Sequence, residues 1–160
     1  MKSKTNNKGF TLVELIVVIV ILAILAAILV PALLGYIDRA RGSGVLLNAK
    51  SMLTATQAEL SDAYGNAKTT GDTPDTVATM FASGSKRLKT IANTADTPGT
   101  GSFNTLDTTA AAATPENHRA WTVGELWYTE GEITVHYKDG EWENPCTEKT
   151  AGTYTIPKKD

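Results

Sequence analysis

This chain has almost no cysteine and no recognisable catalytic motif. Cys146 is its one cysteine, so no internal disulfide can form and the folded part must rely on its core or on assembly. Neither His118 nor His136 lies in a nucleophile, paired-carboxylate or metal-ligand pattern, and no glycine-rich phosphate loop follows a strand-like run. We therefore expect no enzyme activity, no catalytic residue, no metal site and no cofactor.

Acidic residues outnumber basic ones beyond the N-terminus. Three of the fifteen basic residues lie within the first eight positions, so the chain from Phe10 onward has twelve basic residues against seventeen acidic ones, a formal charge of −5. The three early ones are Lys2, Lys4 and Lys8. An acidic chain is unsuited to neutralising phosphates, and we expect no specific nucleic-acid partner.

Charge of either sign is missing from one long apolar segment. No charged residue occurs from Leu15 to Tyr36, and about 20 helical residues at roughly 1.5 Å each span the roughly 30 Å hydrocarbon layer of a bilayer. No small-residue cleavage site follows the run, so it predicts a retained membrane helix rather than an ordinary secretory signal. The lysines before it place the N-terminus in the cytoplasm and the C-terminus outside, by the positive-inside rule.

Glu14 adjoins this segment, with no basic side chain near it in the apolar run. An ionisable group at membrane depth is costly and indicates a functional site that needs a partner. The alternative is a carboxylate close enough to the membrane surface to stay hydrated.

At residues 8–15 the chain reads KGFTLVEL, and the Val/Ile/Leu/Ala run and Pro31 follow. This pattern resembles the class III signal and first helix of type IV pilins and their pseudopilin relatives, over residues 2 to about 41. The resemblance implies an α+β pilin fold. Its long N-terminal helix has a membrane-spanning half and an amphipathic half, and it packs against a C-terminal antiparallel β-sheet.

The resemblance also implies processing and assembly residues. A prepilin peptidase would cut between Gly9 and Phe10 and methylate the new amine of Phe10. Glu14 of one subunit would then meet the Phe10 amine of a neighbour, because charges removed from water must pair. The partners implied are further copies in a homopolymeric filament, the membrane before assembly, the peptidase/methyltransferase and an assembly platform.

Three classes of function remain open. The first is a structural subunit, in particular the major pilin, of a type IV pilus, moving from the cytoplasmic membrane to the cell surface. The second is a pseudopilin of a type II secretion or competence DNA-uptake system. The third is a single-span membrane protein with an extracellular binding domain and no polymerisation. The scaffold leaves adhesion, motility and DNA uptake equally open.

The expected domains are a leader at 1–9, a hydrophobic helix at 10–36 and an extracytoplasmic domain at 37–160. That domain divides into an amphipathic helix at 37–64, a loop region at 65–118 and a β-meander at 119–156. Pro31 predicts a bend, and glycines at 42 and 44 predict a continuous but weakened helix. One stripe of the amphipathic helix is expected to face the core: Leu46, Ala49, Leu53, Thr56, Leu60 and Ala63.

Within the loop region, Thr73 is expected to cap a short helix through Phe81, and another turn or two is expected at 85–92. Residues 94–115 are interpreted as an exposed loop because they are rich in threonine, alanine, glycine and proline. The small basic cluster on the second helix is interpreted as a solvated face: Lys86, Arg87 and Lys89.

The C-terminal third is predicted to form about four antiparallel strands. Strands are expected at 119–123 and 125–129 on either side of Gly124, at 133–138 before the hairpin signal Asp139-Gly140, and at 153–156. The aromatic residues concentrated here are expected to form the core face of the sheet: Trp121, Trp127, Tyr128, Tyr137 and Trp142.

Overall fold

A computed structural model describes residues 9–67, 69–70, 73–74, 76–106, 117–143 and 152–159. The chain divides into two compact units, Met1–Ala40 and Arg41–Asp160, which are considered separately. The predicted α+β class is confirmed. Its first element is a long helix, and a five-stranded antiparallel sheet follows.

The helix α1 extends from Leu12 to Asn66, a length of 55 residues. It continues through Pro31 and through the glycines at 42 and 44, so the expected continuity of the helix is confirmed, and its weakening at the glycines stays a prediction. Proline removes one backbone donor, and the neighbouring turns still carry their own hydrogen bonds. The bend expected at Pro31 stays a prediction.

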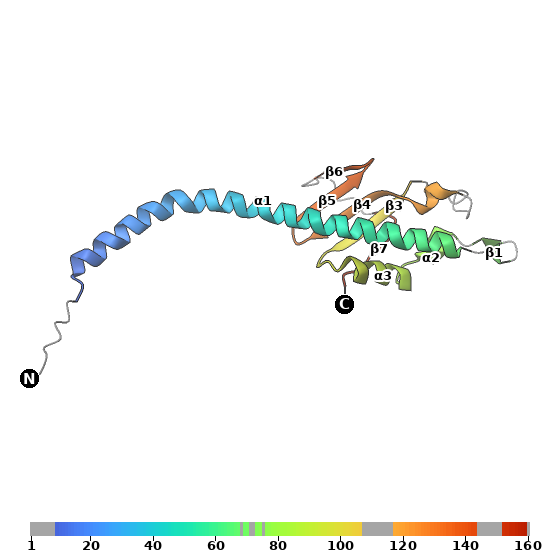
Figure 1. Cartoon of the computed structure of the whole chain (residues 1–160), viewed down its shortest axis with the longest axis horizontal. Helices are drawn as coiled ribbons and strands as arrows, with labels where there is room; N and C mark the ends of the chain where they lie inside the picture. Colours follow the sequence, from blue (N-terminus) through green and yellow to red (C-terminus); the bar gives the residue numbers. More distant parts are fainter. Residues whose placement is uncertain are drawn as a thin grey trace, which may run out of the picture. The chain divides into compact units, whose positions relative to one another are not determined.

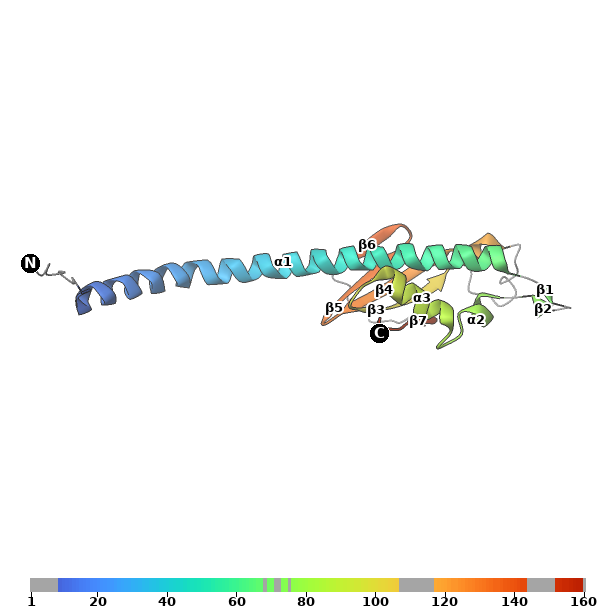
Figure 2. The same ribbon diagram turned by 60° about the horizontal axis from the view of Figure 1, so that its bottom comes forward.

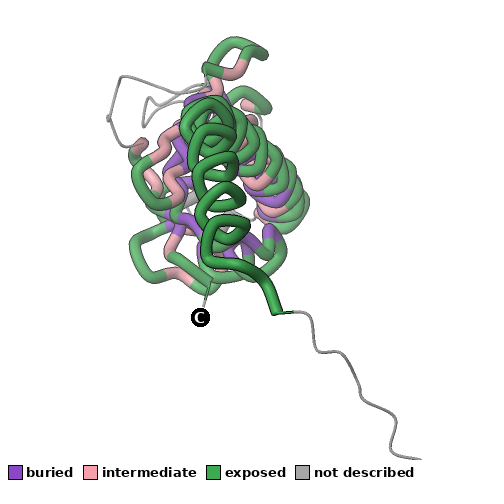
Figure 3. The backbone as a smooth tube through the Cα atoms, turned by 90° about the vertical axis from the view of Figure 1, so that its left-hand side faces the viewer, coloured by how far each residue is buried: buried purple, intermediate pink, exposed green. Residues whose placement is uncertain are grey.

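The second half of α1 is buried on one side (Figure 3). Its buried residues are Val45, Ala49, Met52, Ala55, Thr56, Leu60 and Ala63. Four members of the predicted stripe are among them. Leu46 and Leu53 are only half-buried, and Val45 and Met52 are buried instead, so the contact face lies one residue earlier in those turns.

The sheet consists of β3 (Thr100–Thr105), β4 (Val123–Glu130), β5 (Ile133–Lys138), β6 (Glu141–Glu143) and β7 (Tyr154–Ile156). All neighbouring pairs are antiparallel, and the strand order is β6-β5-β4-β3-β7. Figure 1 shows this sheet packed beside α1.

The predicted meander was wrong in its connections. β7 pairs with β3 rather than following β6, so β3 lies inside the sheet between β4 and β7. The segment 94–115, expected to be an exposed loop, therefore contains an internal strand in which Ser102, Phe103 and Thr105 are buried. Pairing on both sides satisfies the backbone of this threonine-rich strand, which overrides the loop-like composition.

The strand expected at 119–123 is also wrong. Residues His118–Trp121 form the short 3-10 helix η2, and β4 runs through Gly124 as one strand. The register between β3 and β4 shifts beside this glycine. A Cβ at Gly124 would lie 3.0 Å from the Leu106 nitrogen, so glycine permits the close approach of the two backbones there.

Two short helices and a small hairpin fill the region after α1. The hairpin joins β1 (Thr69–Thr70) and β2 (Thr73–Pro74), so Thr73 does not cap a helix as expected. The short helix α2 (Val77–Met80) is capped by Thr76, and α3 (Lys86–Ala95) is capped by Ser85. Both caps supply a hydroxyl oxygen that accepts from a free N–H of the first turn.

The core lies between α1, α3 and one face of the sheet. Its largest fully buried side chains include Tyr128, Phe81, Phe103 and Met52. Trp127 is not part of this core cluster, because it points to the face opposite that of its neighbour Tyr128. It stacks on His136, with ring centroids 4.4 Å apart. The expectation that all five aromatics share the core face was therefore wrong for Trp127.

Candidate functional site

The first half of α1 presents an apolar surface that no described residue covers. An 18-residue window of the helix has a mean hydropathy of 3.4, and none of it is buried. Figure 3 shows this part exposed. Monomeric soluble proteins rarely leave apolar patches of this size in water, so the surface marks a membrane or protein contact. The helix is long and apolar enough to cross a bilayer.

Glu14 lies in the first turn of α1 and is held by Thr11 of the same chain. One carboxylate oxygen, Oε2, accepts from the Thr11 backbone N–H at 2.8 Å and from the Thr11 hydroxyl at 2.7 Å. The Glu14 N–H donates to the Thr11 hydroxyl oxygen at 3.3 Å, and Leu15 donates to the Thr11 carbonyl. Thr11 and Glu14 therefore form a capping box that starts the helix.

Reasoning from the sequence missed this role of Glu14. The signal was present as TLVE at residues 11–14, a threonine followed three residues later by glutamate ahead of an apolar run. The uncleaved chain thus gives the carboxylate a local, uncharged partner.

Gly9 and Phe10 come just before α1 and lie outside any helix or strand. Phe10 is 91% exposed, and a Cβ at Gly9 would meet no atom within 4 Å. Among the described residues, none crowds the peptide bond between them. Pro31, the other predicted site residue, lies within the exposed apolar half of the helix.

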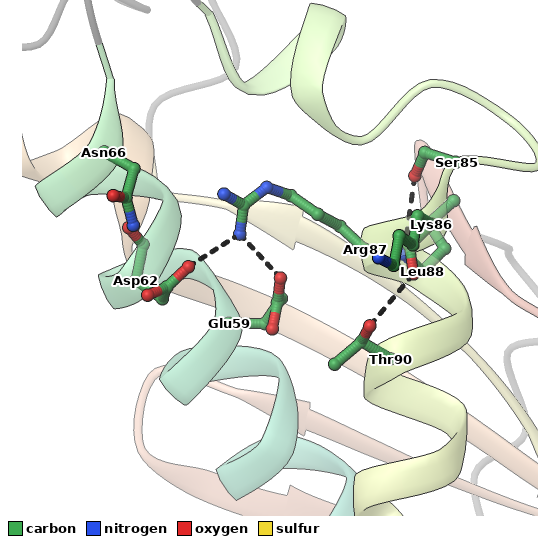
Figure 4. A network of polar contacts seen from close by, with 8 residues as sticks. All are labelled: Glu59, Asp62, Asn66, Ser85, Lys86, Arg87, Leu88 and Thr90. Atoms are coloured by element: carbon green, nitrogen blue, oxygen red, sulfur yellow. Dashed lines mark hydrogen bonds and ion pairs between the residues drawn. The ribbon is translucent and has the colours of Figure 1, made fainter.

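In the second unit, ion pairs join α1 to α3 (Figure 4). A single guanidinium nitrogen of Arg87 lies 2.6 Å from Glu59 Oε1 and 3.0 Å from Asp62 Oδ2. The solvated face expected for the basic cluster is thus wrong for Arg87. Only Lys86 and Lys89 of that cluster are exposed.

A second polar junction ties the sheet to α1 through Tyr128. The Tyr128 hydroxyl accepts from the Gly99 N–H at 3.0 Å and donates to Glu130 Oε2 at 2.9 Å. The same Glu130 oxygen accepts from Asn48 of α1 at 2.8 Å. Burial raises the pKa of Tyr128 above its ordinary value. This junction holds the helix in register on the sheet.

Among the described residues, no group of three His, Cys, Asp or Glu side chains is placed to hold a metal ion. Cys146 lies outside the described ranges, as do residues 1–8 of the expected leader.

Comparison with known proteins points to one kind of assembly. Residues 4–30 match the family model described as the prokaryotic N-terminal methylation motif. The type IV major fimbrial protein FimA of Dichelobacter nodosus is 34% identical over 139 residues, which cover 87% of this chain and 83% of that relative.

Two further relatives match over shorter stretches. The type IV major pilin protein PilA of Myxococcus xanthus is 39% identical over 36% of this chain and 26% of its own length. The type IV wide pilus major component PilA4 of Thermus thermophilus is 58% identical over 25% of this chain and 30% of its own. No solved structure matches the chain.

Proposed function

Since this chain belongs to the type IV pilin family, we propose that it is the major structural subunit of a type IV pilus. The observation that carries the proposal is the uncovered apolar half of α1. Such a surface requires either lipid or other apolar helices around it. Storage in the membrane followed by packing into a homopolymer supplies each of these in turn.

The proposed precursor has three parts. Residues 1–9 are a leader on the cytoplasmic side, 10–36 are the membrane helix, and 37–160 are the domain outside the membrane. Prepilin peptidase cuts between Gly9 and Phe10 and methylates the new amine, and an assembly platform then adds the subunit to the filament. The uncrowded bond between these two residues supports the site of the cut.

In the proposed filament, Glu14 pairs with the Phe10 amine of a neighbouring copy. Before the cut, the Phe10 nitrogen is an uncharged amide, and Glu14 is bonded to Thr11. The cut creates a cationic amine that a carboxylate can neutralise in apolar surroundings. Two ions removed from water cost several kcal/mol each unless they meet, so the pair selects the stagger between neighbouring subunits.

The proposal is tested on filaments sheared from cells that produce the chain. We expect long filaments whose main subunit, by mass spectrometry, begins at N-methylated Phe10. A chain that keeps Met1 and remains in the membrane would contradict the proposal. A correctly cut chain found only in short assemblies within the envelope would assign it to a secretion or DNA-uptake pseudopilus instead.

A further inference from the structure

The edge of the sheet formed by β6 is acidic. Asp139 lies in the turn before β6, and Glu141 begins the strand. Both side chains are exposed, and neither forms an ion pair with another described residue. The cation across from Glu141 in the register, Lys138, already pairs with Glu125 at 2.8 Å. The β6 edge therefore presents negative charge that the rest of the described domain leaves uncompensated.

The opposite side of the same domain is basic. The helix α3 contacts β7, which is the other edge strand of the sheet. Figures 1 and 2 show β6 and α3 on opposite sides of the domain. The exposed lysines without an ion pair among the described residues are Lys50 on α1, Lys86 and Lys89 on α3, and Lys158 after β7. We call these four the basic face.

A groove runs beside the basic face between α1 and α3. Its volume is about 400 Å³, and its lining includes Leu47, Lys50, Thr54, Ala58 and Thr94. Leu47 is 66% exposed there. The groove thus offers apolar surface and an ammonium group together, which suits an occupant with both apolar and acidic side chains. The β6 edge supplies the acidic part of such an occupant, through the exposed side chains of Asp139 and Glu141.

We propose that the β6 edge of one copy of this chain docks on the basic face of the next copy. The proposal rests on the proposed function, because it requires a homopolymer. Two different surfaces that meet head to tail generate an open helical assembly rather than a closed dimer. Two β6 edges, or two basic faces, would repel each other. The charge distribution therefore favours continued growth over pairing of like surfaces.

The test uses charge reversal in the full-length chain, with filaments sheared from cells as the readout. The acidic-edge variant is Asp139→Asn with Glu141→Lys, and asparagine is chosen because residue 139 has a positive φ of 51°. The basic-face variant is Lys86→Glu with Lys89→Glu. Each variant places like charges in the contact, and we expect filament yield to fall at least about tenfold. Combining the two variants should restore most of the yield.

Matched controls separate this contact from a general effect of charge. Glu132→Lys reverses an exposed carboxylate in the β4–β5 turn, at the other end of β5 from Glu141, and Arg119→Glu reverses an exposed cation on η2. Both controls should assemble as the original chain does. All variants should also accumulate in the membrane as processed subunits, because the altered side chains are exposed.

Two results would overturn the docking proposal while the proposed function stands. In the first, the edge and face variants lose no more yield than the two controls, while the original chain forms filaments. In the second, both lose yield but the combined variant does not recover. If the original chain itself stays uncleaved and forms no filament, the proposed function fails, and the docking proposal fails with it.

Discussion

Replacing Glu14 by glutamine separates its two roles, the cap of α1 and the charge. Glutamine at this position still offers an oxygen to the Thr11 N–H, which now donates to the carboxylate at 2.8 Å. A capping box accepts glutamine or glutamate. Glu14→Gln therefore keeps the start of the helix and removes only the negative charge. Glu14→Ala removes both, and Thr11→Ala removes the hydroxyl cap and keeps the charge.

The two roles of Glu14 differ in the expected size of their effects. Loss of the Thr11 cap costs about 1 kcal/mol of helix stability. In the proposed filament, loss of the charge would leave the Phe10 amine of a neighbour unpaired in apolar surroundings, at a cost of about 3–5 kcal/mol. At 1.4 kcal/mol for each factor of ten, that corresponds to roughly two to three and a half orders of magnitude in subunit addition. We expect Glu14→Gln to assemble about as poorly as Glu14→Ala, and Thr11→Ala to lose far less.

The assay compares subunit in sheared filaments with subunit retained in the membrane, by immunoblot. Mass spectrometry of the retained subunit checks that each variant is still cut before Phe10. Filaments at the original yield from Glu14→Gln would refute the pairing and leave the carboxylate as a helix cap alone. A loss with Thr11→Ala equal to that with Glu14→Gln would show that the cap, and not the charge, governs assembly.

Two further predictions concern the stability of the domain, measured by near-ultraviolet circular dichroism of the full-length chain in detergent. Arg87→Met keeps the apolar stem but leaves Glu59 and Asp62 without their cation, and should lower the free energy of unfolding by about 1 kcal/mol relative to the exposed control Lys89→Met. An equal loss in the control would show that the ion pairs contribute nothing. Tyr128→Phe leaves the buried Gly99 N–H without an acceptor and should cost about 2 kcal/mol, or roughly 8 °C in Tm. Burial raises the pKa of Tyr128 in the folded state, so the original chain loses stability as the pH rises above the ordinary tyrosine pKa of about 10. The difference in unfolding free energy between the original chain and Tyr128→Phe should therefore shrink above that pH. A difference that stays constant with pH would contradict this reasoning.

The elements with a strong local pattern were predictable from the sequence. The length of the apolar run and the helical spacing of the stripe in the second half of α1 predicted this helix and most of its buried side, with Val45 and Met52 buried in place of Leu46 and Leu53. The strand Ile133–Lys138 and the turn Asp139-Gly140 after it are confirmed. In that turn both residues adopt positive φ, as the hairpin signal requires.

What escaped prediction depends on contacts between segments far apart in the chain. The sequence TGSFNT of β3 resembles a loop, and it becomes a strand because β4 and β7 pair with it on either side. Arg87 looks like its lysine neighbours until α1 brings Glu59 and Asp62 to it. Glu14 shows the reverse, since the local TLVE motif alone predicts the contacts with Thr11 that the structure shows.

The uncovered half of α1 has a consequence for the energetics of a filament. Lipid tails are about as apolar as the leucine, isoleucine and valine side chains of this segment, so moving it from bilayer to a helical protein interior changes the hydrophobic free energy little. The largest favourable term in ordinary folding therefore nearly cancels between stored and assembled subunits. Small polar terms, such as the proposed pair of Glu14 with the Phe10 amine, would then decide the direction of transfer. A polymer built in this way could be returned to the same membrane with little net work, so growth and disassembly would be two directions of one nearly balanced exchange.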